Sequence, residues 1–150
     1  KRGAARLGPA GGPALCREAA WGRPARGAAT AVGCHVAQIA KSIIFAGQTS
    51  GAALLFVTAG GNRVNEAKAT ALAGEPLGKA DAGLIRAQTG FAIGGVAPLG
   101  HLTPIRAFLD PRLPDFDVVW AAAGTPHHVF SIEPARLASL CMAQVSDFTG

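Results

Sequence analysis

Two apolar runs near the middle of the chain have the length and spacing of paired β-strands. Residues 42–46 and 53–58 consist mainly of aliphatic, β-branched and aromatic side chains. Glycine and small polar residues fill positions 47–51 between them, a composition that favours a reversal of the chain. The pattern therefore predicts a β-hairpin, with Lys41 at the mouth of its first strand.

Two short helices are predicted after the hairpin. Apolar side chains, among them Ala67 and Ala71, recur through residues 64–72 at the spacing of one helix face, and Gly74 ends that run. Asp81 can cap a second helix that ends at Gly90, because its side chain can accept a hydrogen bond from an unpaired amide of the first turn.

Strands alternate irregularly with one further helix in the rest of the chain. Residues 105–109, 117–123 and 128–132 have the composition of strands, and Pro134 marks the first turn of a helix. Residues 143–148 favour a last strand. Such an irregular alternation predicts a mixed α/β (α+β) domain and argues against a doubly wound parallel sheet.

The segment from residue 89 to residue 104 reads T-G-F-A-I-G-G-V-A-P-L-G-H-L-T-P and has the features of a binding loop. Gly94 and Gly95 interrupt an apolar run and allow a ligand close to the backbone, while Pro98 stiffens the chain behind them. Backbone amides held in this way suit a carbonyl oxygen, a developing oxyanion or a phosphate. The same letters are also typical of a tight connection, so both readings stay open on the pattern alone.

Length and composition indicate one soluble domain. The chain has 150 residues, of which 49% are hydrophobic and 15% charged. No uninterrupted apolar run approaches the roughly 18 residues of a membrane span, and the first residues lack the apolar stretch of a secretory signal. We therefore expect a cytoplasmic protein with no membrane partner.

The net charge of +5 is concentrated at one end of the chain. Residues 1–26 contain six of the 14 basic side chains and one of the nine acidic ones, so the remainder carries eight of each sign. This first segment is rich in glycine, alanine, proline and arginine and lacks a clear hydrophobic period. We expect residues 1–26 to form a flexible basic segment that helps to hold phosphate, and residues 27–150 to form a single domain.

The cysteine and histidine residues do not have the spacing of a metal or disulfide site. Cys16, Cys34 and Cys141 give an odd count and form no C-x-x-C motif. The adjacent pair His127 and His128 has no third ligand at metal-site spacing. We expect reduced thiols, no metal and no cofactor.

Several motifs, in a consistent order, resemble one family. Residues 93–101, I-G-G-V-A-P-L-G-H, are similar to the glycine-proline loop of the YbaK-type, prolyl-tRNA-synthetase-associated editing domains. Residues 38–45 resemble the lysine-bearing first core strand of the same family, and residues 57–64 resemble its V-T-A-G-G-N-R-V segment. Three later segments also resemble motifs of the family: residues 78–81, 119–126 and 132–140.

The resemblance covers residues 27–150 and implies a curved, barrel-like mixed sheet flanked by short helices. Relatives of this family usually begin with a helix, a strand and a further helix, and here only residues 27–36 resemble the last of these. The resemblance therefore implies that the chain lacks its first strand or has replaced it.

The resemblance also implies a function. It indicates a trans-acting aminoacyl-tRNA deacylase, which hydrolyses the ester of a mischarged tRNA in proofreading, with aminoacyl-tRNA as substrate and an aminoacyl-tRNA synthetase as a possible partner. One alternative is a catalytically weak tRNA-binding or synthetase-associated module, and another is a small-molecule ester hydrolase that uses the same loop.

Site residues follow from the resemblance. The amides of Gly94, Gly95 and Val96 would contact the ester carbonyl or its oxyanion, and Lys41 would hold the terminal phosphate or the carbonyl. The implied substrate-binding positions are Asn62, Ala97, Pro98, Gly100, His101, Gly124, Thr125 and His127. On the pattern alone, Lys41 is typical of a solvated residue at a strand entry, and Asn62 is typical of a surface residue at a loop apex.

Overall fold

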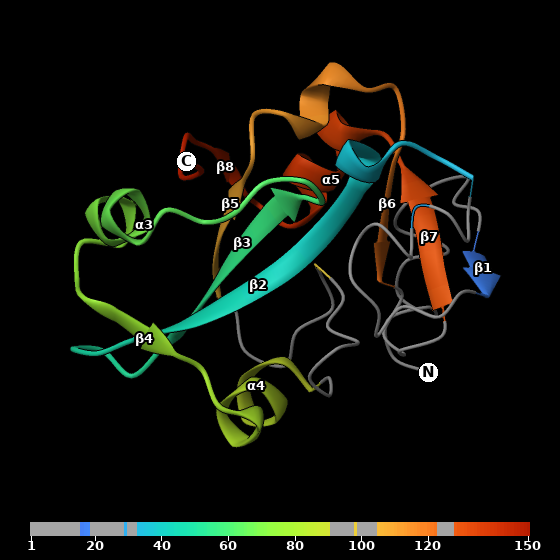
Figure 1. Ribbon diagram of the computed structural model, residues 1–150. Coiled ribbons are helices and arrows are strands. Elements are labelled where there is room, and N and C mark those ends of the chain that lie inside the picture. The colour runs from blue at the N-terminus through green and yellow to red at the C-terminus, as the bar shows by residue number, and fades with distance from the viewer. Residues whose placement is uncertain (1–15, 19–28, 30–32, 91–97, 99–104, 123–127) are drawn as a thin grey trace.

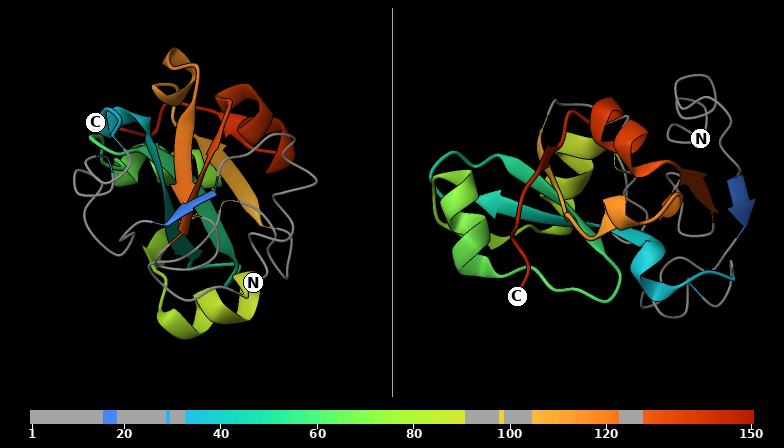
Figure 2. Two further views of the ribbon diagram at one scale, coloured as in Figure 1. Left: turned by 90° about the vertical axis from the view of Figure 1, so that its right-hand side faces the viewer. Right: turned by 90° about the horizontal axis from the view of Figure 1, so that it is seen from above.

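One mixed β-sheet organises the chain. The structure, a computed structural model, describes residues 16–18, 29, 33–90, 98, 105–122 and 128–150. Within these residues eight strands form a sheet of order β1-β7-β6-β2-β3-β5-β8, and β4 pairs with β2 outside that path (Figure 1). The order ends at β1 and β8, so the sheet is open, and its strands twist along it as the two views of Figure 2 show.

The elements have the following bounds. The strands are β1 (Cys16–Glu18), β2 (Ile39–Gly47), β3 (Ala53–Ala59), β4 (Leu77–Lys79), β5 (Arg106–Leu109), β6 (Val119–Ala122), β7 (His128–Ile132) and β8 (Gln144–Val145). The helices are α3 (Glu66–Ala73), α4 (Ala82–Thr89) and α5 (Pro134–Leu140), with 3-10 turns at Val36–Gln38 and Leu113–Asp115. The predicted mixed α+β class is confirmed.

The predicted hairpin is confirmed, and β2 is longer than its apolar run. β2 and β3 pair antiparallel from Ala40 opposite Ala59 to Ala46 opposite Ala53. At its start β2 also pairs in parallel with β6 through Ile39 and Ala40. The pairing with β3 already extends past the apolar run to Ala40, and Lys41 lies opposite Thr58, so Lys41 lies inside β2 and not at its mouth as the sequence predicted.

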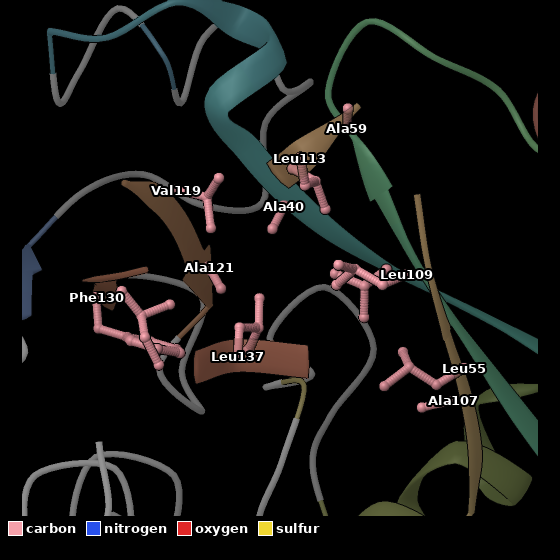
Figure 3. Close-up of a cluster of buried hydrophobic side chains, with 12 residues drawn as sticks. Ala40, Leu55, Ala59, Ala107, Leu109, Leu113, Val119, Ala121, Phe130 and Leu137 are labelled. Carbon is pink, nitrogen blue, oxygen red and sulfur yellow. The ribbon is translucent and has the colours of Figure 1, made fainter. Parts of the chain in front are cut away.

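Strand β3 lies at the centre of the molecule and is buried along its whole length. One face of β3 contributes Leu55 and Val57 to a cluster that includes Leu137 of α5 (Figure 3). The other face contributes Leu54 and Phe56 to a second cluster beneath α3. A strand covered on both faces is apolar throughout and not alternating, as residues 53–57 are.

The ends of the helices follow the local signals. Asn65 caps α3 by accepting from the Lys68 amide at 3.1 Å, and Asp81 caps α4 by accepting from the Leu84 amide at 2.7 Å. Gly74 and Gly90 follow the two helices with φ of 79° and 80°, in the left-handed region that glycine enters without strain. The predicted cap at Asp81 and the predicted ends at Gly74 and Gly90 are confirmed, whereas the cap at Asn65 was not predicted.

The buried face of α3 differs from the predicted one. Ala67 and Ala71, which the sequence placed on the apolar face, are exposed, and Ala69 and Ala73 are buried instead. Alanine occurs on two opposite sides of this helix, Ala67 with Ala71 and Ala69 with Ala73, so the spacing of these residues could not choose a face. The contact with Phe56 and Phe108 of the sheet chooses it.

The C-terminal strands agree with the predicted ones in place, and all but β7 are shorter. β5, β6 and β7 lie within the three predicted ranges, and α5 begins at Pro134 as expected. The last predicted strand, residues 143–148, is reduced to Gln144–Val145, which pairs in parallel with β5. No helix in the described ranges is long and apolar enough to cross a membrane.

The basic N-terminal segment supplies a strand. Residues Cys16–Glu18 pair antiparallel with β7 as β1, with Arg17 opposite Val129. The sheet therefore continues beyond β7, where the resemblance implied a lost or replaced first strand.

Candidate functional site

Lys41 projects from β2 on the face that α3 covers. Ile43 and Phe45 share this face, because alternate residues of a strand point to the same side, and both pack into the cluster beneath α3. The Lys41 side chain is half-buried, and its Nζ lies 3.5 Å from the carbonyl oxygen of Gly60. The ammonium is thus held above the turn that follows β3.

The electrostatic surroundings of Lys41 disfavour its charge. Burial is the main cause that lowers the pKa of Lys41, and the neighbouring charge of Arg63 lowers it further. Asp110 acts in the opposite direction and raises it. The two ion pairs described in the structure, Lys68 with Asp147 and Arg112 with Asp115, do not involve Lys41. Its charge is therefore available to a bound anion.

Asp110 is a buried carboxylate that ties this turn to the end of β5. It is 1% exposed, its Oδ2 accepts from the Ala59 amide at 3.0 Å and from Asn62 Nδ2 at 2.9 Å, and its Oδ1 accepts from the Arg112 amide at 2.9 Å. Its own amide donates to the Val57 carbonyl oxygen at 2.9 Å. These bonds fix the position of the turn relative to the sheet.

Sequence reasoning missed Asp110 as a site residue. The one local signal is an aspartate directly after a buried strand, which is typical of many turns. Its partners Ala59 and Asn62 are 51 and 48 residues away in the chain. The structure brings Asp110, Asn62 and Lys41 together around the Gly60 turn.

Between β6 and β4, the edge of β2 has no described strand beside it. β6 pairs with Ile39 and Ala40, and β4 pairs with residues 45–47. The Val57 carbonyl oxygen and the Ala59 amide bond to Asp110, so these backbone groups point away from β2. Ser42 lies opposite Val57, and in an antiparallel pair the backbone groups of such a residue point away from the partner strand, here β3. The Ser42 hydroxyl is also shielded from solvent without a hydrogen-bond partner.

Most of the predicted glycine-proline loop lies outside the described residues. This applies to Gly94, Gly95, Val96, Ala97, Gly100 and His101, and likewise to Gly124, Thr125 and His127. Pro98 is described and is buried. Lys41 and Asn62 are therefore the predicted site residues whose surroundings can be compared with each other. In the part of the chain that is described, no three His, Cys, Asp or Glu side chains are grouped to hold a metal.

A shallow hollow of about 220 Å³ lies at the opposite end of the β2–β3 hairpin from Lys41. Its polar groups already hold the fold together. Glu75 accepts from the amides of Thr49 and Ser50, and Arg106 donates to the carbonyl oxygens of Leu72 and Ala73 at the end of α3. This hollow is therefore a structural junction, and the Lys41 turn is the better candidate site.

The fold and the Lys41 turn together define an α+β domain that presents a half-buried cation over a polar turn. The family model of the aminoacyl-tRNA editing domain matches residues 21–140 of this chain. The chain belongs to the aminoacyl-tRNA editing domain family.

Solved structures and a curated protein resemble the chain over most of its length. A candidate trans-editing enzyme for prolyl tRNA synthetase, known from its crystal structure, is 44% identical in sequence to this chain. The match covers 100% of this chain and 98% of the chain of that enzyme, with a TM-score of 0.89. The hypothetical protein APE2540, at 23% identity, with full coverage of both chains and a TM-score of 0.86, shows the same fold. The protein YwhH of Bacillus subtilis (strain 168) is 29% identical over 118 residues, which are 79% of this chain and 74% of YwhH.

Proposed function

We propose that the chain is a trans-acting aminoacyl-tRNA deacylase, which hydrolyses the ester between a wrong amino acid and the 3′-terminal ribose of a tRNA. Membership of the editing family supports this proposal, as does the similarity over the whole chain to the candidate trans-editing enzyme for prolyl tRNA synthetase. The observation that carries it is the Lys41 ammonium, half-buried and outside any described ion pair, above the turn that Asp110 fixes.

The proposed reaction demands little chemistry from the protein. The ester carbonyl must be polarised, a water molecule must be placed for attack, and the ribose oxygen must be stabilised as it leaves. Lys41 supplies a compact positive charge for the terminal phosphate or the carbonyl oxygen. The amides of Gly94, Gly95 and Val96 are the proposed donors to the oxyanion, and Pro98 is proposed to keep that loop rigid.

Further binding roles are proposed for the other residues of the predicted site. Asn62, whose side chain donates to Asp110, is proposed to contact the substrate beside Lys41. His127 is proposed to contact the aminoacyl group and His101 to steady the loop or contact RNA. With no general base assigned to the protein, a ribose hydroxyl of the substrate is proposed to assist the attacking water. We propose that the reaction takes place in the cytoplasm, in association with a synthetase that produces the mischarged tRNA.

Deacylation of defined aminoacyl-tRNAs tests the proposal. Proline-specific tRNA, charged with proline or with a smaller, wrong amino acid, is incubated with the protein, and a panel of other mischarged tRNAs extends the comparison. We expect release of the wrong amino acid and retention of the correct one. A synthetase pocket cannot strongly reject a smaller amino acid by binding alone, so the discrimination is made by a second, hydrolytic step. Binding without turnover would favour a tRNA-binding module, and neither binding nor turnover would favour a small-molecule esterase.

A further inference from the structure

The turn that holds Lys41 also carries a second cation, Arg63. Its backbone is fixed on both sides of the residue. The Arg63 carbonyl oxygen accepts from the Gly150 amide at 3.3 Å, and the next residue, Val64, forms an antiparallel bridge with Thr149. On the other side, the Asn62 amide donates to the Ala59 carbonyl oxygen at 2.9 Å and its side chain donates to Asp110. An exposed arginine side chain thus extends from a rigid turn.

No carboxylate in the described part of the chain is paired with Arg63. The described acidic partners of exposed cations are Asp147 and Asp115, and both are bound to other residues. The Lys41 Nζ lies 3.5 Å from the carbonyl oxygen of Gly60, three residues before Arg63 in the same turn, and the charge of Arg63 lowers the pKa of Lys41. The carboxylate that acts against this effect is Asp110, whose oxygens already accept three hydrogen bonds.

Two neighbouring cations with so little countercharge favour an anion between them. The positive charges of Arg63 and Lys41 repel each other. An anion bound between them adds an attraction to each of the two cations. Arginine can donate two parallel hydrogen bonds to two oxygens of one phosphate, and lysine adds a compact charge to a third position. The rigid turn means that little conformational entropy is lost when the anion binds.

We propose that Arg63 and Lys41 bind one backbone phosphate of the substrate RNA, with Arg63 fixing the position of that phosphate relative to the turn. This inference rests on the proposed function, since it takes tRNA as the ligand of the same site. Arg63 is a binding residue in this arrangement and does not touch the ester. Its loss therefore acts on tRNA affinity and on KM and leaves kcat at saturating substrate nearly unchanged.

Salt titrations of tRNA binding test the inference without any need for hydrolysis. The dissociation constant for uncharged tRNA is measured from low to physiological salt for the parent protein, Arg63→Gln and Arg63→Lys. Arg136→Gln is the matched control, because Arg136 is an exposed arginine on α5, the helix that packs on the opposite face of the sheet. Urea denaturation of the same samples verifies that each variant is folded.

One lost phosphate contact has a defined signature. We expect Arg63→Gln to weaken binding about three- to tenfold at low salt and to reduce the slope of log K against log salt by about 0.7–0.9. Arg63→Lys retains the charge and therefore the slope. Arg136→Gln matches the parent. Equal slopes for the parent and Arg63→Gln would overturn the inference, and so would a parent protein that does not bind tRNA.

A second measurement distinguishes an RNA phosphate from a free one. Inorganic phosphate and uncharged tRNA are titrated separately while the side-chain NMR signal of Lys41 is followed. We expect both to move the signal, tRNA at far lower concentration, and both shifts to weaken in Arg63→Gln. A response to inorganic phosphate without one to tRNA would show that RNA is not the ligand. If tRNA binding depends on Arg63 but no mischarged tRNA is hydrolysed, the deacylase proposal fails and the phosphate site stands.

Discussion

At the scale of single residues, Asp110 has a structural role at the Gly60 turn, and Lys41 has the proposed chemical role. Asp110 is buried and accepts three hydrogen bonds from groups on the turn and beyond β5. Lys41 is half-buried, and among the described residues its ammonium makes one long hydrogen bond, to the Gly60 carbonyl oxygen. Substitutions at the two positions should therefore differ in kind.

Replacing Asp110 should lower stability. In Asp110→Asn one carboxylate oxygen becomes an NH₂ group that faces the Arg112 amide or the donors at Ala59 and Asn62, so a buried donor loses its acceptor. We expect a loss of about 2–3 kcal/mol in the free energy of unfolding, measured by urea denaturation. The control is Asp115→Asn, which removes an exposed carboxylate paired with Arg112 and should cost less than about 1 kcal/mol. Equal effects of the two substitutions would contradict the structural role of Asp110.

Replacing Lys41 should lower activity and leave stability nearly unchanged. We expect Lys41→Ala to lose about 2–4 kcal/mol of transition-state stabilisation, the range seen for loss of one preorganised contact. Lys41→Arg should recover little of it, because the planar guanidinium cannot take the place of a compact ammonium. Single-turnover deacylation at saturating protein, with melting curves on the same samples, measures both quantities. Rates near the parental value in Lys41→Ala would return the residue to an ordinary surface role.

At the scale of elements, β2 connects the two halves of the sheet. Its first residues pair in parallel with β6, residues 40–46 pair with β3, and its last residues pair with β4. The stretch in between, with Lys41 and Ser42, has β3 as its one described neighbour strand. The strand therefore presents the proposed site from a position that is anchored at both ends.

The segment from residue 89 to residue 104 is the element on which the proposed chemistry depends most. If the Gly95 backbone lies against the substrate, Gly95→Val should abolish turnover, since the added branched side chain takes the space of the ester. Folding should be largely retained, because loops tolerate substitution better than the core. Deacylation rates and urea curves are compared for Gly95→Val and the parent. A folded Gly95→Val protein with unchanged deacylation would reduce this segment to a connection.

At the scale of the whole molecule, the basic N-terminal segment combines charge with a structural role. Residues 1–26 carry the whole net charge of +5, and three of them form β1 beside β7. A deletion of all 26 residues would therefore remove both a source of phosphate affinity and the strand that covers the edge of β7. The two contributions can be separated by a shorter deletion.

We expect a deletion of residues 1–15 to raise the KM for tRNA and to flatten its salt dependence, because Lys1, Arg2 and Arg6 are lost while β1 is kept. Its kcat and its free energy of unfolding should stay near the parental values. The deletion of residues 1–26 should flatten the salt dependence further and also lower stability, since β7 loses β1 and keeps only β6 as a described neighbour. Kinetics at several salt concentrations and urea curves measure both. A large fall in kcat for a stable protein lacking residues 1–15 would contradict a role in affinity alone.

The sequence by itself determined the features that depend on neighbours in the chain. The β2–β3 hairpin, the caps Asn65 and Asp81, the glycine ends of α3 and α4 and the start of α5 at Pro134 are all set within a few residues of the signal. Of these, the cap at Asn65 was not predicted, because the helix was expected to begin at residue 64. Motif order also led to the family without any structure.

Only the tertiary structure decided which residues meet. Asp110 reaches Ala59 across 51 residues of chain, Lys41 lies inside β2 because the pairing with β3 continues to Ala40 opposite Ala59, and the contact with Phe56 and Phe108 selects the buried face of α3. The pairing of β1 with β7 joins residues more than a hundred positions apart. The physical reason is the same in each case: a hydrogen bond or an apolar contact between distant segments depends on how the sheet is assembled, and the sequence near either partner is compatible with many such pairings.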